Sequence, residues 1–226
     1  MSRRTLGTVV ALLGVLLLAD AVLSLTWREP VTAVLGERAA AQLPARLEAT
    51  TARLDRELTG RIDAVAAPQA RMALAARALA QQAAPGDALG RITIPRIDAR
   101  FTVVQGTAAT NLLAGPGHYP ATALPGEHGT VGLAGHRTTY LQPFRHLDAL
   151  RRGDRVVLAM PYGRFTYVVT GSRVVAPSRV AVLASAAGPE RLVLTACHPL
   201  FSAAQRLVVT ARLADATPLG PARAIS

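Results

Sequence analysis

Residues 191–210, RLVLTACHPLFSAAQRLVVT, contain two apolar β-like runs on either side of a His-Pro turn. Apolar runs of this length, bounded by turn residues, are typical of strands. If the two runs pair as antiparallel neighbours, Cys197 at the end of the first and Arg206 at the start of the second lie side by side. The stretch therefore predicts a β-hairpin that carries a thiol and a guanidinium at one end.

Short β-rich runs alternate with Gly/Pro turns from Asp87 onward. We expect strands at 91–95, 100–105, 130–135, 155–160, 164–175, 180–184, 191–197 and 206–213. Even spacing of this kind is typical of an all-β barrel or sandwich. We therefore predict one all-β domain over residues 87–215, followed by a flexible tail at 216–226.

The first segment, residues 1–28, is predicted to be a membrane anchor. Residues 5–26 are apolar and long enough to cross a bilayer as a helix, and Arg3 and Arg4 before them indicate a cytoplasmic N-terminus. Asp20 is costly in hydrocarbon but lies near the outer end of the segment. A cleaved signal peptide is the alternative, although no small-x-small cleavage site follows. We expect a single-pass plasma-membrane protein whose remaining residues lie outside the cytoplasm.

Residues 29–86 are Ala-rich and predicted to form a helical stalk or linker. One helix face is formed by apolar residues at steps of seven, four, four and three: Leu47, Leu54, Leu58, Ile62 and Val65. Pro68 interrupts the pattern, and a second Ala-rich segment ends at the Pro85-Gly86 breaker. A stalk that stands clear of the domain and a helical hairpin that lies on it both fit this pattern.

The net charge of +11 comes from 25 basic residues, all of them arginine. Nucleic-acid binding needs a clustered basic face with interleaved aromatic residues. Here the arginines are scattered and aromatic residues are only 4% of the 226, so we expect no nucleic-acid partner. The charge instead predicts a solvated cationic surface, suited to anionic polymers of the cell envelope.

Cys197 is the only cysteine and has no partner for an internal disulfide. A free cysteine is often a small buried hydrophobe, but this one ends a strand just before a turn, which favours a functional thiol. His136 ends the run at 130–135 and is the expected acid or base. His198 adjoins the thiol, but neighbours in an extended segment point to opposite faces. With Arg206 as donor to a developing oxyanion, these residues predict covalent thiol catalysis.

Metal binding is not predicted from the sequence. The five histidines match no compact zinc pattern, and the carboxylates of Glu127, Asp148 and Asp154 are too few for calcium, which needs six or more oxygens. We expect neither a metal nor another cofactor.

Three stretches resemble the sortases, which are membrane-anchored cysteine transpeptidases of Gram-positive cell surfaces. They are GRITIPRID at 90–98, GPGHYPATALPGEHGTVGLAGHRTTY at 115–140 and LTACHPLFSAAQR at 194–206. The last two most resemble class E sortases of actinobacteria. The resemblance implies an eight-stranded sortase-type β-barrel after the N-terminal transmembrane helix and helical stalk.

The resemblance also implies a mechanism. The Cys197 thiolate attacks the Thr carbonyl of a Leu-Pro-x-Thr-Gly or Leu-Ala-x-Thr-Gly sorting signal, and His136 as imidazolium protonates the leaving amine. Arg206 holds the oxyanion or the substrate backbone. The acyl group then passes from the enzyme to an amine of a peptidoglycan precursor. Reference pKa values leave only about 1% of sites as the thiolate–imidazolium pair, so slow turnover is expected.

One position departs from the family pattern Thr-Leu-x-Thr-Cys. This chain has VLTAC, so Ala196 stands where the family has Thr before the nucleophile Cys197. We expect Ala196, Thr195, His198 and Tyr119 to contact the substrate. The departure keeps two alternatives open: a membrane-tethered β-barrel that only binds wall polymers or sorting signals, and a thiol hydrolase in which water accepts the acyl group.

Overall fold

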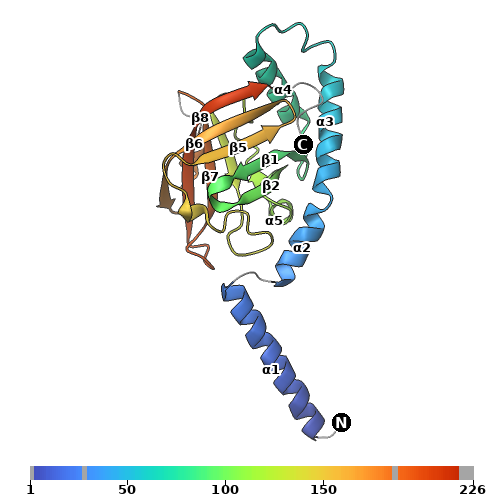
Figure 1. Cartoon of the computed structure of the whole chain (residues 1–226), viewed down its shortest axis with the longest axis vertical. Helices are drawn as coiled ribbons and strands as arrows, with labels where there is room; N and C mark the ends of the chain where they lie inside the picture. The colour runs from blue at the N-terminus through green and yellow to red at the C-terminus, as the bar shows by residue number, and fades with distance from the viewer. Residues whose placement is uncertain (1–2, 27–29, 185–187, 219–226) are drawn as a thin grey trace.

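The hairpin predicted at residues 191–210 is formed by two neighbouring strands of the sheet. The computed structural model describes residues 3–26, 30–184 and 188–218 (Figure 1). In it, β7 (Arg191–His198) pairs antiparallel with β8 (Gln205–Pro218). Their register sets Cys197 directly opposite Arg206.

Eight strands close into a barrel in the order β1-β2-β3-β4-β7-β8-β6-β5. The remaining strands are β1 (Ala88–Ile94), β2 (Ala99–Gln105), β3 (Gly117–His118), β4 (Thr130–Ala134), β5 (Arg155–Met160) and β6 (Gly163–Val175). Two pairs are parallel, β2 with β3 and β4 with β7. The eight-stranded barrel expected from the sequence is therefore confirmed.

Two details of the strand prediction are wrong. The run at 180–184 is a 3-10 turn, Val180–Leu183, whose Val182 is buried against the outer face of β7 and β8. A short apolar run does not by itself distinguish a strand from a packed turn. The strand that was missed, β3, has only two residues and therefore shows no alternation.

Alternation along β7 fills the barrel and determines which side chains face outward. Leu192, Leu194 and Ala196 belong to the main core inside the barrel, whereas Val193 packs with residues outside it. Successive side chains of a strand point to opposite faces. Cys197 therefore lies on the outer face of the sheet.

A buried carboxylate ties the start of β7 to the turn before β4. Glu190 is 2% exposed, and its side chain accepts hydrogen bonds from the Tyr167 hydroxyl (2.5 Å) and from the backbone N–H groups of Gly126 (2.9 Å) and His128 (3.3 Å). Burial and then the Glu190 charge raise the pKa of Tyr167, so its phenol stays protonated and donates. The bonds offset the cost of burying this carboxylate.

The predicted stalk lies against the barrel. The helices α3 (Leu43–Leu58) and α4 (Pro68–Gln82) form a hairpin, and Figure 1 shows α3 running along one side of the sheet. Leu54 and Leu58 join the main barrel core. Pro68 begins α4 because proline is tolerated in the first turn, where its missing N–H has no partner to lose. Of the two arrangements that the sequence left open, the chain adopts the hairpin.

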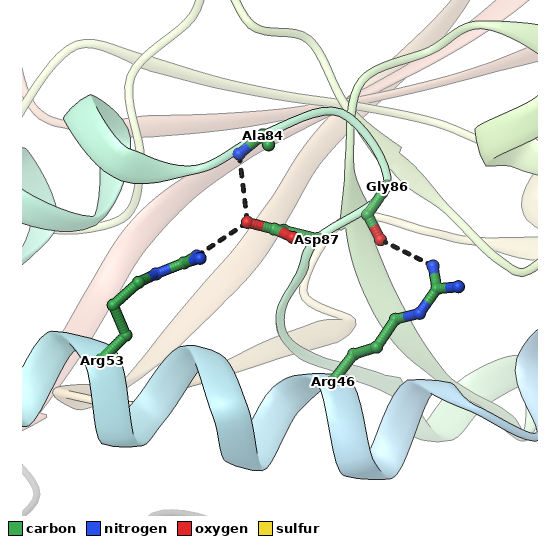
Figure 2. A network of polar contacts seen from close by, with 5 residues as sticks. All are labelled: Arg46, Arg53, Ala84, Gly86 and Asp87. Carbon is green, nitrogen blue, oxygen red and sulfur yellow. Dashed lines mark hydrogen bonds and ion pairs between the residues drawn. The ribbon is translucent and has the colours of Figure 1, made fainter.

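Polar contacts join α3 to the segment that enters β1 (Figure 2). Arg53 Nη2 lies 2.7 Å from Asp87 Oδ2, which also accepts the N–H of Ala84 at 3.1 Å. About two turns earlier on the same helix, Arg46 Nη1 donates to the carbonyl of Gly86 at 3.3 Å. The ion pair is partly exposed and contributes little stability, so these contacts mainly determine where the helix sits.

The remaining helices are α1 (Arg3–Thr26), which extends away from the barrel in Figure 1, α2 (Pro30–Ala40) and α5 (Ala109–Leu112). Short 3-10 turns lie at Pro95–Ile97 and Leu147–Ala149. Over the part of the chain that the structure describes, no helix has the length and apolar character needed to cross a bilayer, so the predicted transmembrane helix is not confirmed. Of the predicted tail, residues 216–218 lie in β8 and 219–226 lie outside the described residues.

Leu54→Ala should lower the free energy of unfolding of the whole barrel by about 2–4 kcal/mol, because Leu54 is 1% exposed and its removal leaves a cavity in the shared core. Chemical denaturation followed by far-ultraviolet circular dichroism measures the change. Arg56→Ala, at an exposed position of the same helix, is the control. A barrel that unfolds as before would mean that the hairpin is an independent unit.

Candidate active site

A cleft of about 420 Å³ lies where β4 and β7 end. It is lined by His136, Arg137, Thr138, Thr139, Cys197, Phe201, Ser202 and Ala203. The parallel register pairs Ala134 with Thr195, so the chain leaves both strands at the same edge of the barrel. His136 is two residues past that point on one strand, and Cys197 is two residues past it on the other. The predicted thiol and imidazole therefore share one cleft.

Cys197 is a free, partly exposed thiol on the outer face of the sheet. The chain turns just beyond it at the cis peptide bond between His198 and Pro199. A partly exposed cysteine in a cleft is accessible to a substrate, unlike a cysteine that fills a core. The position fits a nucleophile.

His136 lines the cleft with one ring nitrogen unpaired among the described residues. Its Nε2 atom is buried and has no hydrogen-bond partner among the described residues. Desolvation by burial lowers the pKa of His136 below 6.5. The imidazole is therefore mostly neutral at pH 7, and its charged form is scarcer than the reference pKa implies. The Tyr140 ring lies 5.0 Å from the imidazole between centroids.

The Arg206 guanidinium is directed toward its own turn. Nη1 donates hydrogen bonds to the carbonyls of Ala203 (3.0 Å) and Gln205 (2.9 Å). The strand register keeps the Arg206 backbone opposite Cys197, but its side chain is not among those that line the cleft. Arginine has five N–H donors, so donors remain for an oxyanion after these two bonds.

Tyr119 and Thr195 meet beside the thiol. The Tyr119 hydroxyl is 2.8 Å from Thr195 Oγ1, and Thr195 is on the same face of β7 as Cys197. Gly132 leaves room for the Tyr119 ring, because a Cβ there would lie only 3.0 Å from Tyr119 Cδ2 and 2.9 Å from Leu183 Cδ2. Tyr119 is partly exposed on this outer side of the sheet, whereas Thr195, at 4% exposed, lies buried beneath its hydroxyl.

A buried histidine supports the segment that carries Tyr119. His118 is 2% exposed, and its ring nitrogens lie 2.8 Å from Gln105 Oε1 and 3.0 Å from the Ala123 carbonyl. Burial lowers the pKa of His118 to about 4, so this ring is neutral at physiological pH. Its role is to hold the segment in place, and it lies outside the cleft.

The structure does not bring Ala196 or His198 into contact with the cleft. Ala196 is 4% exposed and packs inside the barrel, because it alternates with Thr195 and Cys197 along the strand. His198 points the same way, and its Nδ1 lies 3.3 Å from Arg137 Nη1. Ala196 therefore faces the barrel interior, and its predicted contact with the substrate stays a prediction from the sequence. The departure from the family pattern alters the core.

Arg137 was not singled out from the sequence, yet it joins the two sides of the cleft. It is 2% exposed and pairs with Asp148 at 2.8 Å. Its Nε and Nη2 donate to the Arg145 carbonyl at 3.1 and 3.0 Å, and Nη1 reaches His198. The guanidinium thus links the residue after His136 to the residue after Cys197. Only its adjacency to His136 marks it in the sequence.

Metal ligands are not grouped in the region that the structure covers. No three side chains of His, Cys, Asp or Glu lie close enough together there to hold an ion. The polar groups lining the cleft are the Cys197 thiol, the His136 imidazole, the Arg137 guanidinium and the hydroxyls of Thr138, Thr139 and Ser202.

Arg137→Ala should lower the free energy of unfolding by about 2 kcal/mol, since it leaves the Arg145 carbonyl and His198 without their donor. Turnover should fall further than stability alone explains, because the segments after His136 and Cys197 are no longer linked. Thermal melts and turnover assays at a temperature where the variant is folded measure the two effects. Arg96→Ala, at an exposed position, is the control; wild-type turnover in Arg137→Ala would contradict the linking role.

Comparisons with known proteins show the family to which the chain is similar. A family model described as the sortase domain matches residues 92–214. Sortase D of Bacillus subtilis (strain 168) is 37% identical over 114 residues, which are 50% of this chain and 56% of that protein. Sortase SrtE1 of Streptomyces coelicolor is 32% identical over 149 residues, 59% of this chain and 42% of that protein. The chain thus spans about half the length of these curated relatives.

A solved sortase structure is similar to this chain in fold and sequence. The structure of sortase E from Streptomyces avermitilis superposes with a TM-score of 0.55 at 35% identity. The match covers 60% of this chain and 93% of that one. The similarity therefore includes nearly all of the solved domain.

Proposed function

The chain belongs to the sortase family, and from this premise we propose that it is a cysteine transpeptidase that cleaves a sorting signal and transfers the acyl group to an amine. The observation that carries the proposal is the single cleft lined by both Cys197 and His136. A thiol and an imidazole in one cleft are the parts that covalent thiol catalysis needs.

The reaction follows from these two groups. The Cys197 thiolate attacks the carbonyl carbon of Thr in the signal, and negative charge develops on the carbonyl oxygen. Arg206 donates to that oxygen, using donors not taken by its turn. As the C–N bond breaks, the His136 imidazolium gives its proton to the leaving amine. The product is a thioester on Cys197 and a neutral imidazole.

The second half of the reaction, transfer of the acyl group to an amine, uses the same Cys197 and His136 groups. An incoming amine attacks the thioester, His136 accepts its proton, and the Cys197 thiolate leaves. The resting thiolate–imidazolium pair is thereby restored. Because burial lowers the pKa of His136, few molecules hold that pair at neutral pH, and the proposal includes slow turnover.

The donor is proposed to be a surface protein that ends in a Leu-Pro-x-Thr-Gly or Leu-Ala-x-Thr-Gly signal, and the acceptor a peptidoglycan-precursor amine. The signal would lie along the outer face over Tyr119, which covers the buried Thr195, with its Thr carbonyl at Cys197. The similarity to sortase E supports assignment to class E. The Tyr119 hydroxyl, which is hydrogen-bonded to Thr195, is the polar group that we propose contacts the signal.

The test incubates the protein with fluorescent Leu-Pro-x-Thr-Gly and Leu-Ala-x-Thr-Gly peptides, with and without an oligoglycine or diaminopimelate amine, and separates the products. Transfer product should form with the amine, and Cys197→Ala or His136→Ala should lower the rate at least a thousandfold because each removes a reacting group. Cleavage to free acid that the amine does not divert would favour a hydrolase. Turnover by Cys197→Ala would contradict the proposal.

Attachment to the plasma membrane stays a prediction from the sequence. If the prediction is right, the full chain stays in the membrane fraction after a high-salt wash. Protease added outside intact cells should then digest the barrel. A chain recovered in the soluble fraction would contradict it.

A further inference from the structure

The loop after His136 is held by a helix from the N-terminal part of the chain. Thr32, on α2, accepts a hydrogen bond through its Oγ1 from the backbone N–H of Tyr140 at 3.0 Å. The ring of the same Tyr140 lies 5.0 Å from the His136 imidazole, tilted by 49°. One residue thus contacts the helix through its backbone and the histidine through its side chain.

Tyr140 has a backbone conformation that needs support. Its φ angle is +57°, in the left-handed region that bulky residues rarely adopt. Such a conformation persists only when surrounding contacts hold it. If Tyr140 relaxed to negative φ, the angle between its amide and its ring would change, and the ring would leave His136. The bond from Thr32 fixes the amide against that change.

A second contact lies one turn further along α2, where Gly36 packs against Leu141, the residue after Tyr140. A Cβ built at Gly36 would lie 3.1 Å from Leu141 Cγ and 3.2 Å from the Leu141 backbone nitrogen. These distances are closer than side chains normally tolerate, so the helix backbone packs directly on the loop at this point. Thr32 and Gly36 therefore engage two successive residues of the histidine loop.

We propose that α2 is a positioning element for the active site, in which Thr32 and Gly36 hold residues 140–141 so that the Tyr140 ring fixes the His136 imidazole in the cleft. Thr32 touches neither the substrate nor the reacting atoms, so it is a positioning residue. The kinetic part of this inference rests on the proposed transpeptidase function, whereas its structural part does not.

Thr32→Val in the full chain removes the acceptor at almost unchanged shape. We expect kcat for peptide transfer to fall about tenfold, because a misplaced acid–base group slows each proton transfer. The KM for the sorting peptide should stay the same, since the outer face at Tyr119 and Thr195 is unaltered. Thr32→Ser keeps the hydroxyl and should restore kcat.

Two further variants separate positioning from general stability. Thr51→Val is the matched control, because that hydroxyl bonds only within α3, to the Leu47 carbonyl; it should leave kcat unchanged. Gly36→Val pushes α2 off Leu141 and should lower kcat as Thr32→Val does, while the melting temperature shows that each variant is folded.

Histidine-selective NMR provides a readout that does not need activity. The His136 ring protons lie in the ring current of Tyr140, so their resonances should move in Thr32→Val and Gly36→Val and return in Thr32→Ser. Unmoved His136 resonances with wild-type kcat in Thr32→Val would overturn the inference, as would an equal loss in Thr51→Val. A wild-type chain that transfers no peptide would refute the proposed function instead, and the NMR comparison would still decide whether α2 positions His136.

Discussion

The parallel pairing of β4 with β7 is the constraint on which the site depends. Because Ala134 is paired with Thr195, both strands end at one edge, and the residues that follow them open into the same cleft. A slip of one residue would turn Cys197 into the barrel and Ala196 out of it. The buried Glu190 bonds join the turn before β4 to the start of β7 at the opposite end, so the register is held at both ends.

The cleft is assembled from contacts made by several parts of the chain. Arg137 links the segments after His136 and Cys197 and is almost completely buried. The α3–α4 hairpin completes the barrel core through Leu54 and its neighbours. On the far side of the histidine loop, α2 contacts Tyr140 through Thr32. Helices from the Ala-rich segment at residues 29–86 thus support the barrel and its active edge.

The sequence predicted the strands with long apolar runs and the placement of Cys197 and His136 at strand ends, because those features depend on local pattern. It did not reveal β3, whose two residues are defined only by their partners. It also did not decide between a stalk and a hairpin, since the apolar face of α3 needs a partner in either case. Ala196 faces the barrel interior because side chains alternate along β7, and the expectation of a substrate contact did not apply that alternation to this residue. Arg137 became visible only through its burial, which tertiary packing creates.

The central claim is that Cys197 attacks a sorting signal and holds its acyl part as a thioester. The most direct measurement is the intact mass of the full chain after brief incubation with each sorting peptide, quenched in acid, followed by peptide mapping. The account predicts a mass increase equal to the N-terminal part of the peptide through Thr, located on Cys197, sensitive to hydroxylamine and lost in Cys197→Ala. A folded protein that gives no adduct with either peptide, or an adduct on another residue, would contradict it.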